Sequence, residues 1–180
     1  MTTLPYKIAT LCDLRDERGR ILLLRRLKAP NQGLCSPIGG KLDMAEGESP
    51  AECARREIWE EAGLEVPLER LHLMGLIAEQ AYEGKGHWLL FYFRVLGAVS
   101  VQEREMAEGR LEWHEPAAIE ALPLPDTDRR IIWPLVREAE RGWSEELHAK
   151  QGVKPGFFSV HIDCRTPEMK WRVHQQTRAV

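Results

Sequence analysis

The chain has 180 residues, of which 43% are hydrophobic and 29% are charged, and its formal net charge is −3. This length fits a single domain with a sizeable core, and no apolar run reaches the roughly 18 residues that a membrane-spanning helix needs. Broad binding to a nucleic acid backbone requires a basic surface, so we expect neither a membrane nor a nucleic acid as partner.

The first seven residues lack the basic and apolar regions of a signal peptide, which favours a cytoplasmic location. The four cysteines, Cys12, Cys35, Cys53 and Cys164, are scattered without zinc-like spacing. We therefore expect reduced thiols that mostly pack in the interior.

Strand-like and helical runs alternate along the chain. Strands are predicted at 8–12 and 21–24 around a turn at 16–19, as a second pair at 71–78 and 88–95, and at 110–113. Helices are predicted at 50–62, 116–121 and 127–141. Interleaved strands and helices indicate a layered α/β domain.

The helix at 50–62 has both ends marked. Ser49 and Glu52 form a capping box, Pro50 stands at the first helical position, and Gly63 supplies the stop. A narrow stripe of small apolar residues follows one side, which allows close packing against a sheet. A packed helix of this kind holds its polar side chains still.

Three acidic residues on this helix, Glu57, Glu60 and Glu61, can face one point, because helical residues advance by about 100° each. Clustered carboxylates repel one another, and a hard divalent cation with oxygen ligands removes that penalty. An acidic helix face is often merely solvated. The marked ends and the packing stripe favour the metal site.

The last stretch alternates apolar and polar residues at 157–163 and 169–174, with a turn between them, and predicts a β-hairpin. Three placements are open: a new edge of the sheet, a cover over the active site, or pairing with a second subunit in a homodimer. His161 and His174 are interpreted as surface residues. We expect a main domain at 1–145 and an extension at 146–180 that packs on it.

Residues 40–64 resemble the signature of the Nudix hydrolases: a glycine, a spacer, Glu48, seven residues, and then Arg56-Glu-Ile-Trp-Glu-Glu-Ala-Gly-Leu64. Seven residues separate Gly40 from Glu48 where the signature has five, and loops absorb such insertions at small entropic cost. The resemblance, strongest to the MutT-type oxidised-purine triphosphate diphosphatases, implies an α/β/α sandwich with a mixed central sheet. It also implies cleavage of a phosphoanhydride with Mg²⁺, or Mn²⁺ as its substitute.

The resemblance assigns metal binding to Glu57, Glu60 and Glu61, with the carbonyl of Gly39 as a backbone ligand. A fourth carboxylate usually enters from outside the signature, and Glu108 is our choice. Glu105 and Glu112 are its rivals, and all three acids could instead solvate a loop. The general base on the attacking water is Glu57 or Glu108, within a catalytic set that also contains Glu60 and Glu61.

Further roles follow from the same resemblance. Arg56 is expected to pair with Glu48 and fix the loop to the helix, although an ordinary surface ion pair is the alternative. Arg26 and Lys41 are the candidates for contacting phosphate. Arg25 points the other way if its segment is extended.

Base recognition is assigned to Asp126 and Asp128, which precede Trp133-Pro134 as in the oxidised-purine subgroup, and to Ser36. Asp126 is equally well explained as a helix N-cap, with Asp128 in the first helical turn.

The implied function is hydrolysis of a nucleoside triphosphate to monophosphate and pyrophosphate, with 8-oxo-dGTP favoured. A dinucleoside polyphosphate or another nucleoside diphosphate derivative is an alternative substrate, because Tyr82 lies about as far beyond the signature as the aromatic marker of that subgroup. An inactive ligand-binding regulator is the alternative of another class. The retention of Glu57, Glu60 and Glu61 argues against it.

Overall fold

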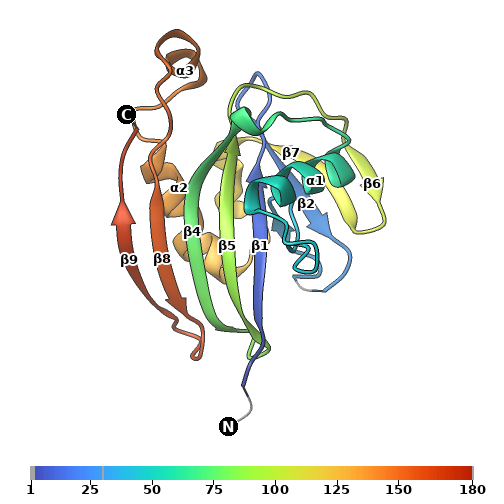
Figure 1. The fold of residues 1–180 in the computed structure, drawn as a ribbon, viewed down its shortest axis with the longest axis vertical. Helices are drawn as coiled ribbons and strands as arrows, with labels where there is room; N and C mark the ends of the chain where they lie inside the picture. The colour runs from blue at the N-terminus through green and yellow to red at the C-terminus, as the bar shows by residue number, and fades with distance from the viewer. Residues whose placement is uncertain (1–2, 30, 180) are drawn as a thin grey trace.

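The computed structural model describes residues 3–29 and 31–179 (Figure 1). Met1, Thr2, Pro30 and Val180 lie outside these ranges, so the start of the segment considered for a signal peptide is not described. Within the described ranges the strands form two sheets. The larger has the order β1-β5-β4-β8-β9 and the smaller the order β3-β2-β7-β6.

The larger sheet is mixed. Its strands are β1 (Tyr6–Asp13), β4 (Leu71–Tyr82), β5 (Gly86–Val95), β8 (Phe158–Asp163) and β9 (Lys170–Gln176). β1 runs parallel to β5, and β8 runs parallel to β4, whereas β4 with β5 and β8 with β9 are antiparallel. The predicted pairing of 71–78 with 88–95 is therefore confirmed.

The smaller sheet is antiparallel and contains β2 (Ile21–Arg26), β3 (Cys35–Ser36), β6 (Arg104–Met106) and β7 (Gly109–His114). The predicted pairing of 8–12 with 21–24 is wrong, since β1 and β2 belong to different sheets. One edge of β1 is occupied by β5. The other edge is occupied by the glycine segment, where the backbone N–H groups of Cys12 and Thr10 donate to the carbonyls of Ile38 and Gly40 at 2.8 Å each.

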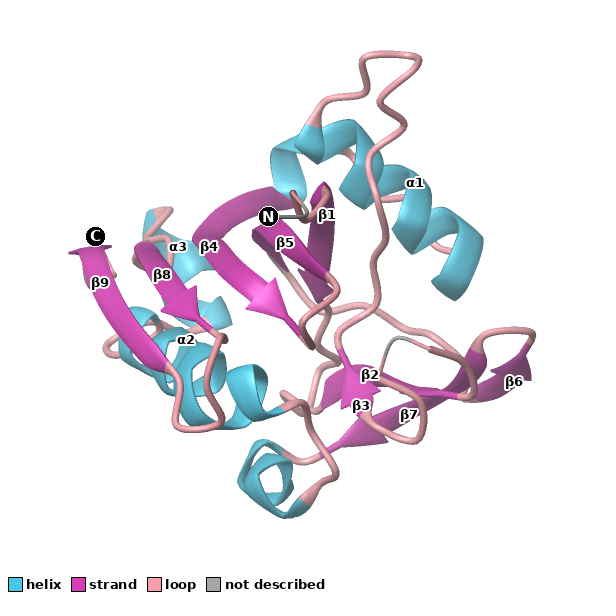
Figure 2. Ribbon diagram, turned by 90° about the horizontal axis from the view of Figure 1, so that it is seen from below, coloured by secondary structure: helices cyan, strands magenta, loops and turns pink. Residues whose placement is uncertain are grey.

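Helices cover both faces of the larger sheet (Figures 1 and 2). On one face α1 (Pro50–Ala62) buries Ala54 and Ile58 in a cluster with Phe93 of β5. On the other face α2 (Trp133–Ala139) buries Trp133 against Tyr92. This arrangement confirms a layered α/β fold with a mixed sheet. No helix in the described part of the chain is long and apolar enough to cross a bilayer.

The remaining helices differ from the prediction in detail. Residues 116–121 form a 3₁₀-helix, and the run predicted at 127–141 is a π-helical turn, Asp128–Ile132, followed by α2. Pro134, in the first turn of α2, has no N–H to donate into the preceding turn. The unpredicted elements are a 3₁₀-helix at Leu68–Arg70, the helix α3 at Glu145–Gln151, and the short strands β3 and β6.

The C-terminal hairpin adds an edge to the larger sheet, because β8 pairs with β4 and β9 lies outermost (Figure 1). Of the three open placements, this is the one the structure shows. The side chain of Trp171 on β9 is about half exposed. A division of the chain after residue 145 and a homodimer both stay predictions.

Candidate active site

The acidic helix α1 is held at both ends. The Ser49 hydroxyl accepts the backbone N–H of Glu52 at 3.3 Å, and the Glu52 carboxylate accepts the backbone N–H of Ser49 at 3.1 Å. Gly63 adopts a left-handed conformation and donates its N–H to the Trp59 carbonyl. These caps satisfy backbone groups that a helix end leaves open, so the register of the acids on the helix is well defined.

Two glycines bring the backbone against this helix. Gly39 has φ +143°, and a Cβ atom there would lie 2.1 Å from the Thr10 carbonyl oxygen. A Cβ atom at Gly40 would lie 2.3–2.7 Å from the carboxylate atoms of Glu57. Only glycine fits at Gly39, whereas the glycine at Gly40 leaves the space that the Glu57 carboxylate occupies.

The two extra residues before Glu48 are absorbed in a compact turn. The Asp43 carboxylate accepts the backbone N–H groups of Ala45 and Glu46 at 3.0 and 3.2 Å. The backbone N–H of Asp43 donates to the Glu48 carboxylate at 2.8 Å, and the N–H of Glu48 donates back to the Asp43 carbonyl at 3.1 Å. The insertion therefore leaves the pairing of Gly40 with β1 intact.

Arg56 connects this turn to the acids of the helix. Its Nε and Nη2 donate to the two carboxylate oxygens of Glu48 at 2.8 and 2.9 Å, and Nη1 donates to Glu57 at 2.7 Å and to Glu60 at 3.2 Å. The hydrogen bonds from Arg56 are the main reason that the pKa of Glu48 falls to about 2. The structure thus places Arg56 as a bridge rather than as a simple surface pair.

The remaining acids lie in a field of like charge. Glu61 is buried, and its carboxylate accepts the Gly39 N–H at 2.9 Å. Burial is the main reason that the pKa of Glu61 rises to about 8, and the charges of Glu57 and Glu108 contribute to this rise. Burial also raises the pKa of Glu57, with Glu60 and Glu108 adding to the effect. A divalent cation among these groups would stabilise their ionised forms.

The all-oxygen donor set suits Mg²⁺. The ligand atoms of Glu57, Glu60 and Glu61 are not gathered within 4.8 Å of one another, and the Glu60 side chain is 53% exposed. Mg²⁺ usually keeps several waters and binds through one or two carboxylates together with substrate phosphates, so a loosely spaced set is compatible with it.

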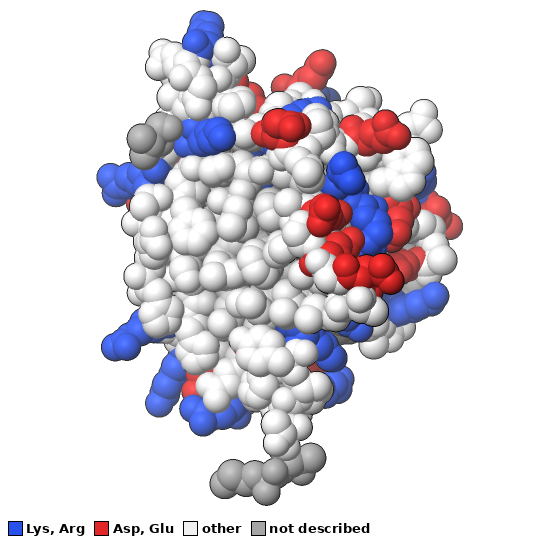
Figure 3. All heavy atoms as spheres, viewed as in Figure 1, with Lys and Arg blue, Asp and Glu red and all other residues white. Residues whose placement is uncertain are grey.

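A cavity of about 460 Å³ opens beside these acids. One group of lining residues carries charge suited to phosphate and metal: Arg26, Gly39, Gly40, Lys41, Glu57 and Glu108. A second group carries groups suited to an aromatic ring and its polar edge: Asn31, Ser36, Glu79, Tyr82, Trp88 and Asp128. Charged side chains also gather over α1 on the face seen in Figure 3, whereas the central strands of that face are largely uncharged.

The structure separates the rival residues. Glu108 lines the cavity, whereas Glu105 is exposed on β6 and Glu112 on β7 pairs with Arg25 at 3.2 Å. Arg26 lines the cavity, so it and Arg25 lie on opposite faces of β2, as alternation along an extended strand requires.

The structure also places Asp126 and Asp128 differently relative to the cavity. Asp128 is buried and lines the cavity, whereas Asp126 is exposed and lies outside its lining, because only the later residue turns inward on the helical segment.

Sequence reasoning missed Glu79, a buried acid on β4 near Asp128. The predicted strand ended at residue 78, and the available signal was that Glu79 continues the alternation of the buried Ile77 one step beyond it. Burial raises the pKa of Glu79 to about 7 and that of Asp128 to about 8.

The buried pair predicts a pH-dependent stability. The pKa of Asp128 rises from 3.8 to about 8 in the folded chain, through burial and then through the nearby Glu79. Between these values the folded state keeps a proton that the unfolded chain releases, so the free energy of unfolding falls as pH rises through this range. In urea unfolding, the free energy of unfolding of Asp128→Asn should depend less steeply on pH than that of the original chain. An unchanged dependence would contradict this, and Asp126→Asn is the exposed control.

Comparison with known proteins agrees with this geometry. The family model of the NUDIX domain matches residues 5–135. The uncharacterized Nudix hydrolase YvcI of Bacillus subtilis (strain 168) is 28% identical over 124 residues, which are 68% of this chain and 75% of that protein. An RNA pyrophosphohydrolase of Cereibacter sphaeroides (strain ATCC 17029 / ATH 2.4.9) is 38% identical over 72 residues, but these span only 41% of that protein and 40% of this chain.

Among solved structures, the MutT protein from Bacillus halodurans superimposes with a TM-score of 0.68 at 26% identity. The match covers 93% of this chain and 97% of that one. The similarity therefore extends beyond the signature to the C-terminal part of the chain.

Proposed function

This chain belongs to the Nudix family, and from that premise we propose that it hydrolyses a nucleoside triphosphate to a monophosphate and pyrophosphate, with Mg²⁺ as cofactor and 8-oxo-dGTP as the favoured substrate. One observation carries the proposal. The acids Glu57 and Glu108 and the cations Arg26 and Lys41 line the same cavity as the buried acids Glu79 and Asp128. A triphosphate and a purine base therefore find complementary groups in a single cavity.

Glu57, Glu60 and Glu61 would hold the metal, with Glu108 and the Gly39 carbonyl as further ligands. When bound, Mg²⁺ supplies positive charge on the phosphates and polarises the anhydride. Arg26 and Lys41 neutralise further phosphate charge.

The proton of the attacking water is taken by Glu57 or by Glu108. Arg56 holds the carboxylate of Glu57 in place through its 2.7 Å hydrogen bond, and Gly40 leaves the space that this carboxylate occupies. Arg56 is thus a positioning residue. A well-oriented base raises the rate because fewer arrangements must be sampled before reaction.

In the part of the cavity proposed to bind the purine base, one acid can be neutral while the other is ionised. A protonated carboxyl group donates a hydrogen bond, and an ionised one accepts. With raised pKa values for both Glu79 and Asp128, the pair can present one of each to a purine edge. The ring of Trp88 supplies an apolar surface in the same cavity.

A second substrate class is favoured by a specific contact. Tyr82 lines the cavity, and its hydroxyl donates to the Asn31 side-chain oxygen at 2.6 Å, which fixes an aromatic ring where a second nucleotide base could stack. Dinucleoside polyphosphates therefore belong in the test, as does RNA, which the name of the Cereibacter relative gives as its substrate. An inactive regulator is disfavoured, because the helix acids and the glycine that accommodates Glu57 are all present.

The test is a panel of substrates. The protein is incubated with Mg²⁺ and normal nucleotides, 8-oxo-dGTP, dinucleoside polyphosphates or triphosphorylated RNA, and the phosphorus products are identified. Pyrophosphate release with a preference for 8-oxo-dGTP is expected. Preferential turnover of another class would reassign the substrate, and no turnover with any divalent metal would favour the regulator.

Base recognition gives a matched pair of variants. Asp128→Asn should change the ratio of kcat/KM for 8-oxo-dGTP to that for dGTP by about tenfold or more, since a good bidentate base contact is worth about 1–3 kcal/mol. Asp126→Asn, at an exposed position two residues earlier, should leave the ratio unchanged. If only Asp126→Asn changed the ratio, the roles of the two residues would be reversed.

A further inference from the structure

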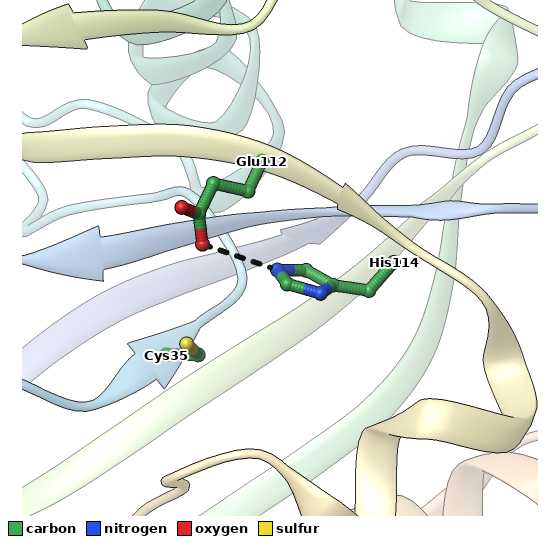
Figure 4. A group of neighbouring side chains, drawn as sticks. All are labelled: Cys35, Glu112 and His114. Carbon is green, nitrogen blue, oxygen red and sulfur yellow. Dashed lines mark ion pairs between the residues drawn. The ribbon is translucent and has the colours of Figure 1, made fainter.

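A second group of metal-binding side chains lies outside the cavity. The sulfur of Cys35, a carboxylate oxygen of Glu112 and a ring nitrogen of His114 all lie within 4.8 Å of one another. Figure 4 shows Glu112 and His114 extending from β7 toward Cys35 on β3. Among the described residues this is the one group of three such side chains that meets this distance.

His114 is the unusual member of the group. Its Nε2 atom is buried and has no hydrogen-bond partner among the described residues, and the nearest acid oxygen, on Glu112, is 3.5 Å away. A buried polar atom without a partner is destabilising, so its retention calls for a reason. Burial also lowers the pKa of His114, which favours the neutral ring that binds metals.

The other contacts of Glu112 set a requirement. Arg25 lies 3.2 Å from one of its carboxylate oxygens and Arg110 lies 3.5 Å from the other. Both arginines are partly exposed, at 38% and 54% of the side chain, so Arg25 can turn to solvent when a cation takes its place. The carboxylate is then shared between the ion and Arg110.

We propose that Cys35, Glu112 and His114 bind a zinc ion, with water at the fourth position. A sulfur, an imidazole nitrogen and one carboxylate oxygen form a donor set that Zn²⁺ accepts in tetrahedral geometry. Mg²⁺, by contrast, prefers oxygen ligands. On binding, the Cys35 thiol releases its proton to solvent and a zinc–sulfur bond forms, with no change of oxidation state.

The position of the cluster suggests its effect. Cys35 and Ser36 are neighbours on β3, and alternation along a strand places them on opposite faces. Ser36 lines the catalytic cavity, so the zinc site lies on the reverse side of the same strand. A bound ion joins β3 to β7 across the intervening β2 and fixes a wall of the cavity. Cys35 then has a packing role alone, as expected from the sequence, when no zinc ion is bound.

Cobalt spectroscopy tests the site directly. With Mg²⁺ in excess to occupy the catalytic acids, Co²⁺ titration should produce a thiolate-to-cobalt charge-transfer band that saturates at one Co²⁺ ion per chain. The band should disappear in Cys35→Ser, and cobalt affinity should fall at least about tenfold in His114→Asn, because even indirect partners of a metal ligand are worth about 10–100-fold. Cys164→Ser and Cys53→Ala are controls, and Cys53 is the thiol beside the catalytic segment.

Absence of the band in the original chain, or its persistence in Cys35→Ser, would overturn the proposal. Because Cys35 is fully buried and its variant could unfold, a second measurement uses His114→Asn and Glu112→Gln. Zn²⁺ should raise the temperature of thermal unfolding of the original chain and leave that of both variants unchanged, with folding checked by circular dichroism. An equal rise in all three proteins would place zinc elsewhere. Neither readout requires hydrolase activity, so this inference fails or stands apart from the proposed function.

Discussion

Replacing Glu61 by glutamine is expected to lower the hydrolysis rate by about 10²–10³-fold at saturating Mg²⁺, because metal-supplied charge stabilisation is worth several kcal/mol and each tenfold in rate is about 1.4 kcal/mol. The fold should survive, since the buried amide oxygen of glutamine can still accept the Gly39 N–H. Glu60→Gln should show a similar loss. Steady-state kinetics as a function of Mg²⁺ concentration measures both effects.

The matched control is Glu65→Gln, an exposed acid just past the end of the same helix. It removes one negative charge just beyond the same helix without removing a proposed ligand, so its rate should stay near normal. Near-normal rates in both Glu60→Gln and Glu61→Gln would refute the metal assignment. A loss in all three variants would point to a general charge effect, which added salt should then suppress.

The second large effect is expected at Gly40, which has no side-chain chemistry of its own. Gly40→Ala would place a Cβ atom 2.3–2.7 Å from the Glu57 carboxylate, so that carboxylate has to leave its position and its contact with Arg56. We expect kcat to fall by about 10²-fold, as when a general base or a metal-binding carboxylate loses its place. The loss of stability should be small, because the displaced group is the end of a flexible side chain.

Two comparisons isolate this effect. Gly39→Ala should mainly destabilise the fold, because its Cβ would meet the Thr10 backbone and because φ +143° strains any residue with a side chain. Gly40→Ala combined with Glu57→Gln should be little worse than the more impaired single variant, since both changes disable the same carboxylate. Additive losses in the double variant would separate Gly40 from Glu57.

Several features were predictable from the sequence because their causes are local. The helix at 50–62 was confirmed to the residue, since its cap, its first-turn proline and its terminal glycine all lie within one or two turns. The strand positions followed from apolar runs. The partner of the first strand could not be predicted in this way. The turn at 16–19 indicates pairing with the next strand, whereas β1 in fact pairs with β5 on one edge and with the glycine segment on the other.

The sequence by itself determined the family, the acidic helix and the glycine pair that precedes it, since each is a pattern of neighbouring residues whose spacing carries the chemistry. Only the tertiary structure decided that Asp128 rather than Asp126 faces the cavity, that Glu79 joins it, and that Cys35 meets His114. These choices depend on which strands pair and which way each side chain points. A shift of one residue reverses the face of a strand, and no local pattern reports the register between distant segments.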